Sequence, residues 1–200
     1  MTENQYTWPA AIKKYAEGKD KDALIYLGHI LHLIEDMTVP DHTRNDPHVG
    51  DPLTGESTYE KWASENKNRT TMNGLSDNYS GLKPIIYNNV LEYFYFLEVY
   101  SNNNFFGDDS IQNNVYQYDK PEIIEKNNKY GFGIDNIFGG KFPIVGIKII
   151  SDGTEQLSLI ANNDYFVLFS YFTRLSKQAI LGSAGVIDLF FREAEKARAD

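Results

Sequence analysis

The chain has 200 residues, of which 28 are acidic and 19 are basic, so its formal net charge is −9. An apolar fraction of 42% can build one sizeable core, which excludes wholesale disorder and predicts a single domain over residues 1–200. The acidic balance argues against a stable nucleic-acid footprint and a polybasic membrane anchor, and no apolar run is long enough to predict a transmembrane segment. Because cysteine is absent, any metal must be held by histidine, carboxylate or backbone groups.

Helical patterns dominate the first part of the chain. A short helix is expected over residues 9–17, and a longer one over 20–36, where a good N-cap residue precedes strong helix formers. Prolines and glycines then predict a loop over residues 37–56. The longer helix has one broad apolar side that we expect to be buried: Leu24, Leu27, Ile30, Leu31, Leu33 and Ile34.

Helical patterns return further along the chain, in four stretches: 57–65, 84–100, about 164–172 and 179–191. Gly182 and Gly185 in the last stretch are expected to permit close helix packing, because they have no side chain. The predicted fold class is therefore all-α, a multi-helix bundle.

Residues 101–163 differ in character, since they are rich in asparagine, aspartate, glycine and tyrosine. We expect an irregular, loop-rich insertion on the helical core. Its β-branched residues near 141–150 indicate a strand, so a short β-hairpin is expected near 141–160. Two glycine-rich sites, Gly131-Phe132-Gly133 and Gly139-Gly140, are typical of turns.

The histidines are the main functional signal, because all four fall within twenty consecutive residues, 29–48. His32 and Asp36 are four residues apart, so on a helix they lie on one face and can grip one ion or two neighbouring ions. Pro40 then ends the helix and can bring His42 back over its end. The alternative is an ordinary solvated helix face. Lysine, glutamate and glutamine normally supply such faces, so we favour metal binding.

The spacing His32-x-x-x-Asp36-x-x-x-Pro40-x-His42 resembles the core motif of the zinc-dependent phospholipase C superfamily, which also contains single-strand-specific zinc nucleases. The preceding Tyr26-Leu27-Gly28 is similar to the family's approach to this motif. The resemblance implies a long central helix, and it implies that His32, Asp36 and His42 bind zinc.

Two positions depart from the family pattern, since Glu35 stands where glycine is usual and Val39 where glutamine is frequent. Downstream, the family has a His-x-x-x-Glu pair that completes a zinc site. Glu60 matches that glutamate, but Glu56 stands at the histidine position. We favour His48 as the replacement ligand.

The runner-up metal ligands are Glu56 and His29. Asp36 and Asp46 are the candidate catalytic carboxylates, with Asp46 as a general base or as a partner that orients a histidine. Aspartates in such loops also commonly form turns.

The function implied by the resemblance is zinc-dependent hydrolysis of a phosphodiester, either a phospholipid or a nucleic acid, by metal-activated water. The family's further ligands precede the central motif, and only 31 residues precede His32 here. We therefore expect the chain to be the C-terminal part of a longer protein or a degenerate relative. A non-catalytic helical domain with a partial or structural metal site is the alternative. If the full-length protein follows the family, it is extracytoplasmic or secreted.

Overall fold

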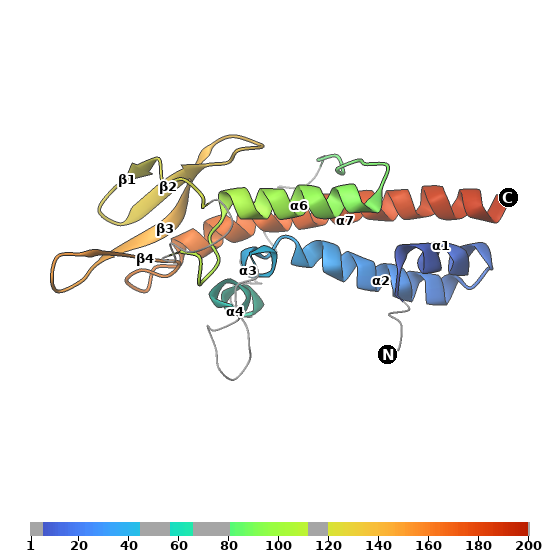
Figure 1. Cartoon of the computed structure of the whole chain (residues 1–200), viewed down its shortest axis with the longest axis horizontal. Coiled ribbons are helices and arrows are strands. Elements are labelled where there is room, and N and C mark those ends of the chain that lie inside the picture. Colours follow the sequence, from blue (N-terminus) through green and yellow to red (C-terminus); the bar gives the residue numbers. More distant parts are fainter. Residues whose placement is uncertain (1–5, 45–56, 66–80, 112–119, 200) are drawn as a thin grey trace.

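The computed structural model describes residues 6–44, 57–65, 81–111 and 120–199 and arranges them along one long helix (Figure 1). This helix, α7 (Phe166–Ala199), has 34 residues and so extends for about 50 Å. The other helices are α1 (Trp8–Ala16), α2 (Asp20–Asp36), α3 (Pro40–Thr43), α4 (Thr58–Ser64) and α6 (Val90–Asn104). The strands are β1 (Glu125–Lys126), β2 (Tyr130–Ile134), β3 (Lys141–Ile149) and β4 (Glu155–Ser158).

The four strands form one antiparallel sheet in the order β1-β2-β3-β4. Among the described residues, 54% are helical and 14% are in strands, so the all-α prediction is wrong and the fold is mixed. The expected hairpin near 141–160 is present as β3 and β4, with Ile147 opposite Leu157. The region expected to be an irregular insertion contains the whole sheet, because β1 and β2 extend that hairpin through hydrogen bonds that no local pattern specifies.

Strand β2 contains Gly131 and Gly133, for which the sequence wrongly predicted a turn. A Cβ added at Gly131 would lie 2.7 Å from the Val145 side chain, and one at Gly133 would lie 3.0 Å from the Ile144 side chain. These glycines therefore serve close packing within the sheet. Gly139 and Gly140 do lie between β2 and β3 and have positive φ angles, as a turn requires.

One part of the core joins the sheet to the first half of α7. Leu168, Tyr171 and Leu175 of α7 are fully buried, as is Ile144 of β3. The Tyr171 hydroxyl donates a hydrogen bond to the Ile144 carbonyl at 2.7 Å and accepts one from the Phe106 amide at 3.0 Å. Burial raises the pKa of this hydroxyl, which keeps it neutral. The sheet is thus fastened to α7 by polar as well as apolar contacts.

The other part of the core is helical and joins α1, α2 and α6 to the second half of α7 (Figure 1). A Cβ added at Gly185 would lie 1.9 Å from the Ile85 carbonyl oxygen. The segment that contains Ile85 can therefore pack this close to α7 only because residue 185 is glycine. At Gly182 the nearest atom would be the Leu97 side chain, at 3.2 Å. The expected close approach at both glycines is present.

Helix α6 begins at Val90, later than the sequence predicted. The Asn89 side chain accepts a hydrogen bond from the Leu91 amide at 2.8 Å and so caps the helix. The Ile85 amide donates to the Leu181 carbonyl of α7 at 3.2 Å, which holds the preceding segment against α7. The chain before Asn89 therefore packs as a non-helical segment.

Two further expectations need correction. The C-terminal stretches predicted as separate helices form the continuous α7. On α2, Leu27, Ile30 and Ile34 are buried as expected, but Leu24 and Leu33 are 48% and 45% exposed. The buried stripe is therefore narrower than the apolar side of the sequence, because α1, α6 and α7 cover only part of α2.

Candidate metal centre

Helix α2 places His32 and Asp36 on one face at its C-terminal end. His32 Nε2 lies 3.6 Å from Asp36 Oδ2, and the His32 side chain is 71% exposed. The two residues are one helical turn apart, which accounts for their contact.

His42 approaches the same carboxylate from the following turn. Helix α2 ends at Asp36, and the short helix α3 begins with Pro40 in its first turn, where proline is well tolerated. This arrangement places His42 Nδ1 at 3.6 Å from Asp36 Oδ1. The expected return of His42 over the end of the helix is present in the structure.

Glu60 reaches the other ring nitrogen of His42 from α4, with Oε1 at 3.3 Å from Nε2. A capping box fixes Glu60, because Ser57 Oγ accepts from the Glu60 amide while Glu60 Oε2 accepts from the Ser57 amide. One carboxylate oxygen of Glu60 thus caps α4 and the other faces the histidine. We call His32, Asp36, His42 and Glu60 the histidine–carboxylate row.

The row holds a positive charge well. The hydrogen bond with Glu60 raises the pKa of His42 above its usual value, against the opposing effect of burial, and the Asp36 and Asp41 carboxylates raise it further. A group of negative charges that favours a proton on His42 also favours a metal cation in its place.

A second set of hydrogen bonds joins the helices that carry the row. The Asp108 amide donates to Asp41 Oδ1 at 2.8 Å, and Asp108 Oδ2 accepts from the Thr58 amide at 2.6 Å. Asp41 precedes His42 in the sequence, and Thr58 lies in the first turn of α4. Asp108 therefore fixes the position of α4, and so of Glu60, relative to α3.

Arg44 anchors α3 from its other end. Its side chain is fully buried and donates hydrogen bonds to the carbonyls of Phe105 and Asn102 at the end of α6. These contacts explain why a short four-residue helix keeps a defined position.

A cleft of about 500 Å³ opens beside the row. His32, Asp36 and Glu60 line it together with Glu35, and Phe172 of α7 contributes to its wall. Its described lining contains no lysine or arginine, so an anionic substrate would face carboxylates unless a cation were bound there.

The donor groups suit zinc, which accepts imidazole nitrogen and carboxylate oxygen. Their neighbouring atoms are 3.3–3.6 Å apart, near the edge of about 3.4 Å of a tetrahedron with zinc bonds of about 2.05 Å. Among the described residues, however, no three His, Asp or Glu side chains form a group that could hold a metal ion. The two ring nitrogens of His42 face different carboxylates, so the four side chains follow one another in a line and do not converge on one point. To surround a single zinc ion, some side chains would have to rotate, above all the exposed His32.

The remaining candidate residues do not join the row in the described part of the chain. Asp46, His48 and Glu56 lie outside the described residues. The runner-up ligand His29 stacks on the Tyr6 ring, with 4.0 Å between the ring centroids.

Sequence reasoning gave no role to Ser57, Asp41, Arg44 or Asp108. The Ser57-x-x-Glu60 spacing is a capping-box signature and could have identified Ser57. The roles of Arg44 and Asp108 depend on contacts with segments 50 or more residues away, for which the sequence contains no local signal.

Comparisons with protein-family models, curated protein sequences and solved structures gave no match to this chain. In the part of the chain that the structure describes, no helix combines the length and apolar character needed to cross a bilayer.

Proposed function

We propose that the histidine–carboxylate row binds zinc and that the zinc-bound chain hydrolyses phosphodiesters. The observation that supports this best is the meeting of His32, Asp36, His42 and Glu60, from three helices, beside one cleft. The residues of the phospholipase C-like motif thus lie together with the downstream glutamate that the resemblance implies.

The charge of the cleft supports the same proposal. Among the described residues, three carboxylates line it in a chain with a net charge of −9, so the bare protein repels a phosphodiester. Bound zinc would supply the positive charge that polarises a phosphoryl oxygen and activates water for attack. The chain's own residues hold the cation, and Ser57 and Asp108 orient Glu60 toward it.

Zinc titration of the metal-free chain tests the binding step. We expect about one zinc per chain, and His42→Ala should weaken zinc binding by at least about tenfold, because it removes the central donor. His29→Ala is the matched control, since it removes another α2 histidine that lies outside the row. Binding well below one zinc per chain, or equal loss in both variants, would overturn zinc binding by the row. The same titration of His48→Ala tests the further ligand predicted from the sequence.

Hydrolysis is tested with the zinc-loaded chain on a chromogenic phosphodiester, phosphatidylcholine and single-stranded DNA. Cleavage that is lost in His42→Ala and retained in His29→Ala would support the enzyme proposal. A chain that binds zinc but cleaves none of these substrates is not a phosphodiesterase.

That last result would favour the second candidate, a structural metal clip. The row joins α2, α3 and α4, so zinc there would stabilise their arrangement without catalysis. The expected sign is a higher unfolding temperature with zinc in the wild type but not in His42→Ala.

A further inference from the structure

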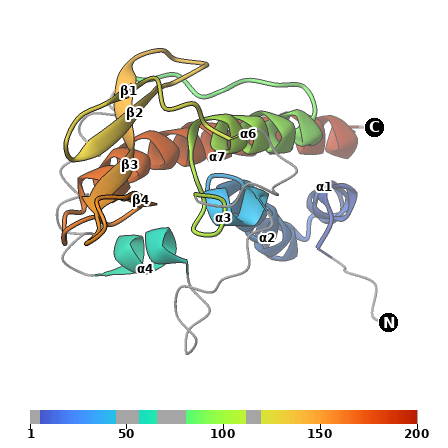
Figure 2. The ribbon, with the colours of Figure 1, turned by 60° about the vertical axis from the view of Figure 1, so that its left-hand side comes forward.

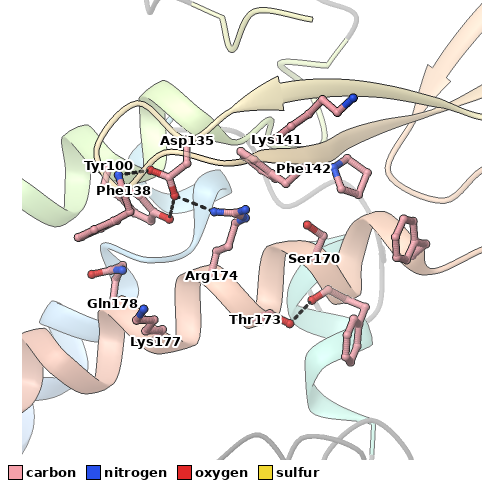
Figure 3. A pocket seen from close by; sticks show the side chains of 13 residues that line it. Tyr100, Asp135, Phe138, Lys141, Phe142, Ser170, Thr173, Arg174, Lys177 and Gln178 are labelled. Atoms are coloured by element: carbon pink, nitrogen blue, oxygen red, sulfur yellow. Dashed lines mark hydrogen bonds and ion pairs between the residues drawn. The ribbon is translucent and has the colours of Figure 1, made fainter. Parts of the chain in front are cut away.

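A second pocket lies on another face of α7, toward the sheet (Figure 3). Its volume is about 460 Å³, within the range of small-molecule sites. Ser170, Arg174 and Lys177 of α7 line it, whereas Phe172 and Ser176 line the cleft beside the histidine–carboxylate row. The two cavities therefore use different faces of one helix and can bind different ligands.

A buried carboxylate organises this pocket. Asp135 accepts hydrogen bonds from the Tyr100 hydroxyl at 2.8 Å and from Arg174 Nη1 at 2.9 Å (Figure 3). It also accepts from the amides of Ile137 and Phe138 in the connection between β2 and β3. With four donors around it, the Asp135 charge is well stabilised inside the protein.

Arg174 is held in one orientation by these contacts. Its guanidinium lies 4.2 Å from the centroid of the Phe142 ring, and its side chain remains 24% exposed. A guanidinium has five N–H groups, and Asp135 takes one at hydrogen-bonding distance. A rigid, partly exposed guanidinium with further donors is well suited to a carboxylate or phosphate.

The pocket is basic although the chain is acidic. Its described lining contains Lys141, Arg174 and Lys177 but one carboxylate, Asp135, so its formal charge is +3 − 1 = +2. Lys141 contacts Glu125 at 2.8 Å and Arg174 contacts Asp135 at 2.9 Å, so a ligand would meet the Lys177 ammonium and the remaining N–H donors of Arg174. Arg174 and Lys177 are three residues apart and so lie on the same side of α7. In a chain with a net charge of −9, such a pocket favours an anion over a neutral molecule.

The walls suit an apolar body attached to that anion. Phe142 and Pro143 form a buried wall, and the lining phenylalanines Phe138 and Phe166 are 54% and 48% exposed. Aromatic side chains left open to water beside a cavity gain free energy when a flat apolar ligand covers them.

An unpartnered polar atom provides an independent observation. Gln178 lines the pocket and is 2% exposed, and its Oε1 has no hydrogen-bond partner among the residues that the structure describes. A buried acceptor without a donor is unfavourable, so a ligand O–H or N–H that reached it would be bound more tightly.

We propose that this pocket binds a small organic anion, in which one carboxylate or phosphate is attached to a flat apolar body about the size of one ring. Arg174 and Lys177 bind the anionic group, the phenylalanines contact the ring, and Gln178 accepts a hydrogen bond from a polar substituent. The proposal is independent of zinc and of phosphodiester hydrolysis.

The test is titration of the full, metal-free chain with benzoate, 4-hydroxybenzoate and phenyl phosphate, followed by NMR. Benzyl alcohol and inorganic phosphate serve as the neutral and ring-free controls. We expect an aromatic anion to shift the Arg174 and Lys177 signals and to bind at least about tenfold more tightly than either control. Comparison of benzoate with phenyl phosphate identifies the preferred anionic group, and 4-hydroxybenzoate tests the substituent near Gln178.

The variants Lys177→Gln and Lys196→Gln form a matched pair, because both remove a lysine from α7 and only the first lines the pocket. Lys177→Gln should weaken binding of the best anion by about tenfold, while Lys196→Gln should leave it unchanged. Phe138→Ala, at an exposed position, should weaken the binding of aromatic anions but not the binding of inorganic phosphate. No binding by any aromatic anion, equal binding of benzyl alcohol, or equal loss in the two lysine variants would overturn the proposal.

Discussion

The two halves of α7 pack against different kinds of partner. The second half packs against α1, α2 and α6 through helix contacts, with Val186, Leu189 and Phe190 buried. The first half packs against the sheet and the end of α6, with hydrogen bonds from Tyr171 and Arg174 among the contacts. The α7 residues that line the two cavities lie in this first half, between Phe166 and Ile180. Figures 1 and 2 show the sheet beside the same end of α7. The second half of α7 thus contributes mainly apolar helix packing, while the first half makes polar long-range contacts and contributes wall residues to both cavities.

The largest expected effect is a loss of stability in the helical half, caused by Gly185→Ala. The added methyl group would overlap the Ile85 carbonyl and the Tyr93 ring, at 1.9 Å and 2.7 Å, and both belong to packed elements. We expect a loss of about 3 kcal/mol in the free energy of unfolding, measured by urea denaturation.

Gly28→Ala is the matched control for that change. Gly28 lies in α2, and no described residue outside its own helix turn has an atom within 4 Å of an added Cβ, so alanine should stabilise the chain by up to about 1 kcal/mol through its helix propensity. Wild-type stability in Gly185→Ala would show that the Ile85 segment does not pack on α7 as described.

A smaller effect is expected in the sheet half, from Tyr171→Phe. The change keeps the ring but leaves the Ile144 carbonyl and the Phe106 amide without their shared partner inside the protein. We expect a loss of about 2 kcal/mol in the free energy of unfolding and faster hydrogen exchange at the Phe106 amide.

Tyr95→Phe is the control, because this tyrosine of α6 is 69% exposed and its substitution should change stability by less than about 0.5 kcal/mol. Equal effects of the two tyrosine variants would contradict a role for polar contacts in holding the sheet on α7.

The same contrast explains what the sequence could predict. The helical half follows local rules in part: the extent of α2 and the close approach at Gly182 and Gly185 were predictable. Asp20 was expected to cap α2, but it is the first helical residue and Lys19 is the cap, while Leu24 and Leu33 are exposed. The hairpin of β3 and β4 was also predictable, because its strands are neighbours. Strand β2 was not, because its glycines match a turn locally and fit a strand only against Val145 and Ile144.

The candidate metal centre divides in a similar way. The contact of His32 with Asp36 follows from helix geometry, and the position of His42 follows from Pro40. The position of α4 depends on Asp108, which lies 50 residues further along the chain from Thr58. Local pattern therefore pointed to the motif residues, and the Ser57-x-x-Glu60 spacing also carries a local signal for the capping box. The Asp108 hydrogen bonds that position α4 could be found only in the tertiary structure.

Asp108→Ala tests whether the contacts of the sheet half matter for the metal centre. Loss of its carboxylate removes the acceptor at the start of α4, so Glu60 should be held less firmly. If the row binds zinc, we expect affinity to fall by about tenfold, measured by competition with a chromogenic chelator, and stability by about 1 kcal/mol. Asp188→Ala removes an exposed carboxylate of α7 that pairs with Arg192, and should leave zinc affinity unchanged. Unchanged affinity in Asp108→Ala, with a clear loss in His42→Ala, would show that Asp108 has no role in positioning Glu60.

The smallest expected effect concerns the place where the sheet meets the start of α7. Asp164 accepts a hydrogen bond from the Tyr130 hydroxyl and another from the Phe166 amide, so it links β2 to α7. The bond to Asp164 raises the pKa of Tyr130 to about 12, and the same bond holds the pKa of Asp164 below its usual value. The contribution of Tyr130 to stability is therefore present below pH 10 and lost as pH rises toward 12, while that of Asp164 is lost as pH falls below about 4. In Asp164→Asn, NMR titration should show the pKa of Tyr130 moving down toward 10, whereas Asp152→Asn, in the turn between β3 and β4, should leave it near 12. An unchanged pKa in Asp164→Asn would mean that this carboxylate does not link the sheet to α7.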